Sequence, residues 1–117
     1  ERIEPHVFVV AVNQQSQIVG FSSITPQGYL HSMFVHKDFQ GEGIATMLLE
    51  EIERYAITAG ITRITSEVSL TARPFFEKKG YVVEKEQKRK ANQLFLINFL
   101  MAKEVAFLEY YNKKVTD

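Results

Sequence analysis

Short apolar runs alternate with polar, glycine-containing segments over the first 35 residues. Three of these runs, at 6–12, 17–24 and 29–35, have the length and the β-branched or aromatic content of a strand. The segments between them, at 13–16 and 26–28, have turn composition. The pattern predicts three consecutive strands, the first two joined as an antiparallel hairpin.

Helical spacing follows these strands. From Ile44 to Ala56, apolar side chains recur three and four residues apart and form one stripe, and the charged side chains lie mostly off it. Gly60 has the position typical of the residue that ends a helix. We therefore expect a helix from Ile44 to about Ala59 with one buried face.

Further strands and a short helix are predicted in the rest of the chain. The strand-like runs lie at residues 61–68, 81–87 and 93–101. Ser69 or Thr71 can cap a helix that runs to Lys79. Because a helical crossover joins parallel strands, the strand at 61–68 should be parallel to the strand at 29–35.

Three expectations concern the C-terminal part. The mixed polar segment 88–92 is expected to be a turn. Residues 94–97 are apolar at every position, which predicts that both faces of this strand are covered. Residues 103–117 have aligned apolar side chains and are expected to form a short terminal helix.

Composition adds the class of protein and excludes several functions. The chain has 117 residues, 45% hydrophobic and 24% charged, with zero formal net charge, as in one globular domain. Neither nucleic acid nor a membrane is expected as a partner. Without cysteine there is no disulfide, thiolate ligand or cysteine nucleophile, and three scattered histidines predict no metal site. No signal peptide is seen, so a cytoplasmic protein is expected.

The segment from Gln40 to Thr46 joins the third predicted strand to the helix. Gly41 and Gly43 tolerate a positive φ and let a ligand approach the main chain. The first N–H groups of the helix have no intrahelical partner and lie at its positive end, which is typical of a phosphate site. The loop lacks the lysine of a P-loop, and Thr46 stands where a dinucleotide fingerprint has glycine or alanine.

Two motifs resemble those of one family. Gln40, Gly43 and Ala45 form Q-x-x-G-x-A, which resembles the pyrophosphate loop of the GNAT superfamily of acyl-CoA N-acyltransferases. SLTARPFFEKKGY, from Ser69 to Tyr81, resembles the N-x-x-A-x-x-x-Y-x-x-x-G-F signature of the family. Over residues 6–101 the resemblance implies an α/β fold. Its sheet would be mixed and mainly antiparallel, with a splayed pair of parallel strands and flanking helices, in a single domain spanning 1–117.

The chain departs from the family pattern in three places. Ser69 replaces the asparagine of the second motif. Phe76 replaces the tyrosine that often protonates the departing CoA thiolate. The strand and two helices that usually begin the domain have no counterpart, and residue 1 is Glu, so the sequence is expected to be incomplete at its N-terminus.

The resemblance implies that acetyl-CoA lies between the third and fourth strands. The third strand would hold the acyl and pantetheine part, the loop would hold the pyrophosphate, and the second motif would line the pantetheine or adenine side. These residues are Met33, Phe34 and Val35; Gln40, Gly41, Glu42, Gly43, Ile44, Ala45 and Thr46; and Ser69, Ala72 and Phe75.

Acyl transfer needs a neutral amine and therefore a general base. Deprotonating a lysine-like amine near pH 7 costs roughly 4–5 kcal/mol, and a base typically contributes about 10²–10⁴ in rate. His31 is the first candidate, because histidine exchanges protons near neutral pH and some family members carry a carboxylate on this strand. Glu67 is the second. Ordinary surface roles stay open for both.

Three functions remain as hypotheses. The first is an N-acetyltransferase that moves acetyl from acetyl-CoA to a small-molecule or peptide amine. The second is a CoA-binding or interaction module without turnover, favoured by Phe76 and the missing acceptor elements. The third is a general nucleotide-phosphate binder, for which ATP or NAD would bind as well as CoA. A homodimer, or docking of segment 103–117, is expected to cover the unprotected apolar edge at 6–12.

Overall fold

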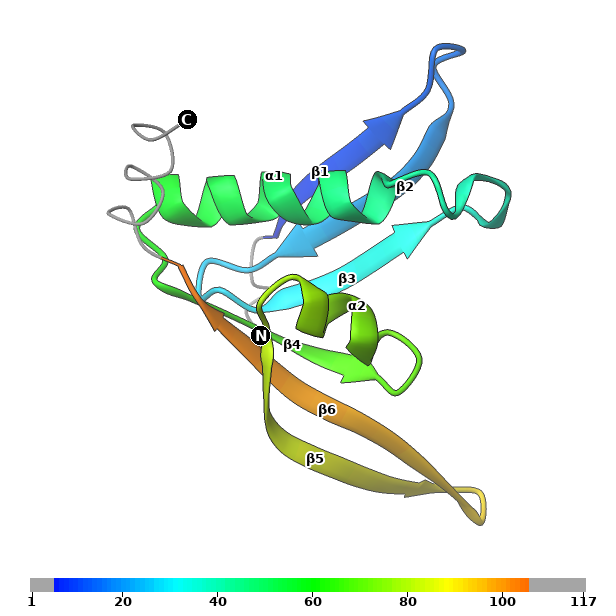
Figure 1. Ribbon diagram of the computed structural model, residues 1–117, viewed down its shortest axis with the longest axis vertical. Helices are drawn as coiled ribbons and strands as arrows, with labels where there is room; N and C mark the ends of the chain where they lie inside the picture. The colour runs from blue at the N-terminus through cyan, green and yellow to red at the C-terminus, as the bar shows by residue number, and fades with distance from the viewer. Residues whose placement is uncertain (1–5, 106–117) are drawn as a thin grey trace, which may run out of the picture.

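The computed structural model describes residues 6–105 (Figure 1). In chain order the elements are β1 (Val7–Val12), β2 (Ile18–Ile24), β3 (Leu30–Val35), the 3₁₀ turn η1 (Lys37–Phe39), α1 (Ile44–Thr58), β4 (Arg63–Ser69), α2 (Arg73–Lys78), β5 (Val82–Ala91) and β6 (Leu94–Glu104). They form two three-stranded sheets, ordered β1-β2-β3 and β4-β6-β5, in which neighbouring strands are antiparallel. The predicted α/β class and element order are confirmed.

The two sheets meet where β3 and β4 begin. Tyr29 and Thr65 form a single parallel bridge, and the Thr65 N–H donates to the carbonyl of Gly28 at 3.0 Å. The Ser66 hydroxyl donates to the carbonyl of Leu30 at 2.9 Å, where a regular ladder would supply a backbone N–H. Beyond this point the two strands belong to different sheets and diverge (Figure 1). The prediction that they run parallel and splay apart is confirmed.

Gly28 permits this close junction. Its φ is +91°, and an added Cβ would collide with the carbonyl oxygen of Arg63 on β4. Both the left-handed conformation and the approach of the two backbones therefore require glycine.

The hydrophobic core lies between the helices and one face of the sheets, and α1 lies over β1–β3 (Figure 1). The main cluster consists of Ile24, Leu30, Leu49, Ile52, Ala56, Ile64, Val68, Phe76, Tyr81, Phe99, Met101 and Val105. Along β1, Val7 and Val9 pack against this core, whereas Phe8 and Val10 point the other way and are 61% and 47% exposed. We call the side of the sheets away from α1 the outer face.

The hairpin of β5 and β6 corrects two predictions. β5 continues to Ala91, so the expected turn over 88–92 is wrong, and the turn is Asn92 and Gln93, both with positive φ. The expectation that residues 94–97 are covered is also wrong, because they are 38–67% exposed. The reason is that β4 ends at Ser69, opposite Asn98, and the hairpin extends past it (Figure 1).

Two smaller predictions also need correction. The residue at the N-cap position of α2 is Ala72, which has no side-chain cap, and Ser69 instead accepts the N–H of Ala72 at 3.1 Å. Lys103 and Glu104 are the last residues of β6, not the start of a helix, and the rest of the expected terminal helix lies outside the described residues. Among residues 6–105, no helix is long and apolar enough to cross a membrane.

Candidate functional site

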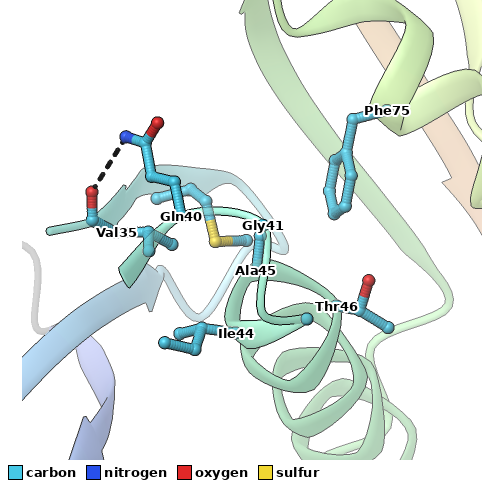
Figure 2. Close-up of a pocket in the computed structure, with 9 residues that line it drawn as sticks. Val35, Gln40, Gly41, Ile44, Ala45, Thr46 and Phe75 are labelled. Atoms are coloured by element: carbon cyan, nitrogen blue, oxygen red, sulfur yellow. Dashed lines mark hydrogen bonds between the residues drawn. The ribbon is translucent and has the colours of Figure 1, made fainter. Parts of the chain in front are cut away.

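A pocket of about 500 Å³ opens between β3, the loop before α1, the first turn of α1, and α2 (Figure 2). It is lined by Met33, Val35, Gln40, Gly41, Gly43, Ile44, Ala45, Thr46 and Phe75. Every one of these residues belongs to the set that the resemblance to the GNAT family implies for the acetyl-CoA site. The structure thus brings together a strand, a loop and two helices that are separate in the sequence.

Two glycines shape the loop. Gly41 and Gly43 have φ of +83° and +81°, which a residue with a side chain rarely adopts. A Cβ built at either position meets no atom within 4 Å. Glycine is thus needed for the backbone conformation, and the space beside the main chain is open to a ligand.

The loop leads directly into the N-terminus of α1. Gly43 is the N-cap, no side chain caps the helix, and the Met47 N–H donates to the Gly43 carbonyl at 3.1 Å. The N–H groups of Ile44, Ala45 and Thr46 therefore have no intrahelical acceptor. They line the pocket at the positive end of the helix dipole, so this wall favours an anion.

Gln40 and Phe75 complete the pocket from opposite sides. The Gln40 amide Nε2 donates to the Val35 carbonyl at 3.3 Å and so ties the loop to the end of β3 (Figure 2). Phe75 reaches the pocket from α2, across from Gln40 (Figure 2). The resulting walls are apolar on the strand and α2 sides and polar at the loop.

Four residues of the predicted set do not line the pocket. Phe34 points to the outer face, where it is 50% exposed and its ring lies 5.5 Å from that of Phe21. Glu42 is exposed on the loop. Ser69 and Ala72 are joined by a hydrogen bond at the start of α2.

His31 lies outside the pocket as well. Ser23 pairs with Ser32 and Ile24 pairs with Leu30, so the ladder skips His31. This is a β-bulge, a feature that redirects a side chain. The exposed His31 ring meets His6 of the segment before β1, at 4.9 Å between centroids.

Tyr29 connects the two candidate bases. Its ring lies 6.0 Å from that of His31. Burial and the charge of Glu67 raise the pKa of Tyr29, and a backbone hydrogen bond at Glu67 partly offsets this rise. His31 and Glu67 thus flank one phenol on the outer face. Sequence reasoning missed Tyr29 and His6, although residues 29 and 31 occupy alternate positions of one predicted strand.

Phe76, which replaces the family's tyrosine, is in the core. It is 5% exposed and packs edge to face against Phe75 and Tyr81, at 5.4 and 5.2 Å. Tyr81 offers no substitute acid, because its hydroxyl donates to Glu53 at 2.8 Å and both burial and Glu53 raise its pKa. No tyrosine lines the pocket in the part of the chain that the structure describes.

The sequence matches the family model described as "Acetyltransferase (GNAT) domain" over residues 1–104. It is 30% identical over 95 residues to the uncharacterized N-acetyltransferase YafP of Escherichia coli, covering 81% of this chain and 58% of YafP. It is 32% identical over 74 residues to the peptidyl-lysine N-acetyltransferase YjaB of Salmonella typhimurium, covering 63% of this chain and 49% of YjaB. The chain therefore spans about half the length of these relatives.

Solved structures agree with these sequence matches. A GCN5-related N-acetyltransferase from Rhodopseudomonas palustris superposes with a TM-score of 0.77 at 29% identity, over 86% of this chain and 62% of that protein. An aminoglycoside 6'-N-acetyltransferase complexed with coenzyme A has a TM-score of 0.74 at 23% identity, over 85% and 72%. At 23% identity, the similarity to the aminoglycoside acetyltransferase supports a shared fold only.

Proposed function

Because this chain belongs to the GNAT acetyltransferase domain family, we propose that it transfers an acetyl group from acetyl-CoA to an amine acceptor. The observation that carries the proposal is the pocket between β3, α1 and α2, whose floor is a left-handed glycine loop and an uncapped helix N-terminus. This combination suits a pyrophosphate beside an apolar chain.

The CoA groups can be assigned to parts of the pocket. The pyrophosphate would accept hydrogen bonds from the N–H groups at Gly41 to Thr46. The pantetheine chain would run between Met33 and Val35 on one side and Phe75 on the other. The thioester would then lie beside β3, where the strand has left β4.

The reaction forms one bond and breaks one. The amine nitrogen attacks the thioester carbon, the tetrahedral adduct collapses, and the CoA thiolate leaves as the amide forms. The proton lost by the amine goes to a base, for which we propose His31 first and Glu67 second. With Phe76 in the core and Tyr81 bound to Glu53, we propose that solvent protonates the thiolate.

Titration calorimetry and a thiol-release assay test the proposal. Acetyl-CoA should bind, ATP and NAD should bind far more weakly, and thiol should be released with at least one amine of a broad panel. If ATP binds as tightly as acetyl-CoA, the pocket is a general nucleotide-phosphate site and not a CoA site. Binding of CoA without thiol release for any amine would support the alternative function, a CoA-binding or interaction module without turnover.

The class of acceptor belongs to the same proposal. One relative is named a peptidyl-lysine acetyltransferase, so peptide amines and small-molecule amines both belong in the panel. A cytoplasmic location and a homodimer are further parts of the proposal. Within residues 6–105, the unpaired edge of β1 supports the homodimer.

A further inference from the structure

A row of four aromatic rings crosses the outer face and ends beside a carboxylate. Neighbouring centroids are 6.1 Å apart for Phe8 and His6, 4.9 Å for His6 and His31, and 6.0 Å for His31 and Tyr29. At the end of the row, Tyr29 bridges in parallel to Thr65 of β4, and Glu67 lies two residues beyond Thr65, beside His31 in the register of the bridge. We call the four aromatic residues, together with Glu67 at their end, the aromatic row.

Alternation along the strands places the aromatic row opposite the core. Val7 and Val9 pack against the core, so Phe8 points outward and is 61% exposed. On β4, Ser66 and Val68 are buried, so Glu67 between them also points outward and is exposed. The acetyl-CoA pocket and the aromatic row therefore lie on opposite sides of β3.

The row ends where the two sheets separate. Tyr29 forms the last bridge to β4, and Ser66 takes the next carbonyl, that of Leu30. Met33, three residues beyond Leu30, already lines the pocket. A group held beside Tyr29 and Glu67 thus faces the opening between β3 and β4, with the proposed thioester on the other side.

The charge at this end of the row is available for a ligand. Glu67 forms no ion pair within residues 6–105, whereas Arg63 on the same strand is already paired with Glu84 and Glu104. Lys85 shares the cross-strand row of Glu67, but it lies two strands away beyond Leu100, at about 10 Å by strand spacing. Because Tyr29 is held neutral, its hydroxyl adds a dipole and no second charge.

We propose that the aromatic row binds the acceptor, and that the acceptor is a primary ammonium attached to an apolar, preferably aromatic, body. Glu67 would hold the ammonium beside the Tyr29 hydroxyl, and the rings of His31, His6 and Phe8 would contact the body. This rests on the proposed acetyl transfer, to which it adds the acceptor class. The ammonium gives its proton to His31, and the free amine then attacks through the opening between the strands.

Calorimetric titration with 2-phenylethylamine, with and without CoA, tests the proposal independently of turnover. The parent should bind the amine, and Glu67→Gln should weaken binding at least about tenfold, since a charge-assisted contact is lost. Glu86→Gln on β5 is the matched control and should leave amine binding within about twofold. Neither change should alter CoA affinity. No measurable amine binding by the parent, or equal binding by Glu67→Gln, would overturn the proposal.

Further variants and ligands test the other parts of the row. Tyr29→Phe keeps the ring and should weaken amine binding several-fold. Phe8→Ala should weaken the binding of amines whose apolar body is long enough to reach Phe8 at the far end of the row, but not that of methylamine. Tighter binding of spermidine than of 2-phenylethylamine would contradict the proposal that the acceptor has an apolar body. If CoA does not bind but amine binding still depends on Glu67, the proposed acetyl transfer is contradicted and the proposed amine site is supported.

Discussion

At the residue scale, Gly43 is where a single side chain would enter the pocket without colliding with another protein atom. Gly43→Glu would put a carboxylate into space that is free of protein atoms within 4 Å, against the proposed pyrophosphate. Two unit charges 4 Å apart near a protein surface interact by about 4 kcal/mol, so CoA binding should fall more than about 100-fold. Calorimetry measures the loss.

Gly60 provides a matched control for this change. It has φ of +82° and equally open surroundings, but it follows the other end of α1. Gly60→Glu therefore carries the same backbone strain and charge away from the pocket, and CoA should bind it like the parent. Unchanged CoA binding by Gly43→Glu would remove the loop from the site.

The second prediction at this scale concerns the base. His31→Ala should lower kcat/KM by about 10²-fold or more and flatten its rise with pH, because a base acts only when unprotonated. The decrease in kcat should also be larger for His31→Ala than for Glu67→Gln, because Glu67→Gln keeps the proposed proton acceptor, His31. His36→Ala is the control, since the His36 ring accepts the Asp38 N–H at 3.1 Å outside the aromatic row. An unaltered rate and pH profile for His31→Ala would leave Glu67 or water as the base.

At the element scale, a cluster of polar side chains links α1, β6 and the end of α2. Tyr81 donates to Glu53 of α1 at 2.8 Å, and Lys103 of β6 reaches both oxygens of Glu53 at 3.2 Å and the Lys79 carbonyl at 2.9 Å. Tyr81 is only 2% exposed. The cluster therefore fixes the end of α2, the helix that carries Phe75 into the pocket.

Tyr81 should make the free energy of unfolding decrease with rising pH in the alkaline range. Burial and Glu53 raise its pKa well above the usual value of about 10. The folded state thus keeps a proton that the unfolded state loses above pH 10, so the free energy of unfolding should fall by about 1.4 kcal/mol per pH unit there. Below pH 10 this contribution is fully present. Urea titrations from pH 8 to 11 measure the slope.

Tyr81→Phe separates the hydrogen bond from the other contributions. The variant should lose about 1–3 kcal/mol at pH 8, because Glu53 loses a partially buried donor. Its stability should decline less steeply above pH 10 than that of the parent. Since Tyr29 also has a raised pKa, Tyr29→Phe is the matched comparison, and it should keep the steeper part of the slope. Parallel curves for the parent and Tyr81→Phe would contradict this role of Tyr81.

At the scale of the whole molecule, the expected homodimer depends on β1. Within residues 6–105, β1 pairs only with β2, and its outer side chains Val10 and Val12 are 47% and 55% exposed. An unpaired apolar edge without Pro or Lys invites association. Sedimentation over a wide concentration range should therefore show a dimer.

Val10→Lys is the test substitution, because a charge on an edge strand opposes pairing. It should shift the protein toward monomer, whereas Val82→Lys, at a 61% exposed position on β5, should not. A parent that stays monomeric at high concentration would exclude the dimer. Docking of residues 106–117, which lie outside the described residues, would then be tested by deleting them.

Local patterns were enough to predict most elements and the pocket loop. Spacing places α1 within one residue of its observed end, and Gly41 and Gly43 adopt the positive φ that their sequence context indicates. The lining residues were anticipated through the resemblance to the GNAT family, and those of the loop and the first turn of α1 are also contiguous in the sequence. Backbone conformation and neighbouring N–H groups depend on only a few consecutive residues.

Other features were decided by how distant segments meet. An apolar run such as residues 94–97 looks the same whether it is covered or not. Its exposure depends on where β4 ends, at Ser69 opposite Asn98, and these two residues are 29 positions apart in the sequence. The proximity of the Tyr29 ring to His31, and the position of Glu67 near Tyr29, likewise need the bridge to β4 and the bulge in β3. Sequence determines what each segment can form, and only tertiary packing decides which side chains share a face, because strand pairing and length set the neighbours.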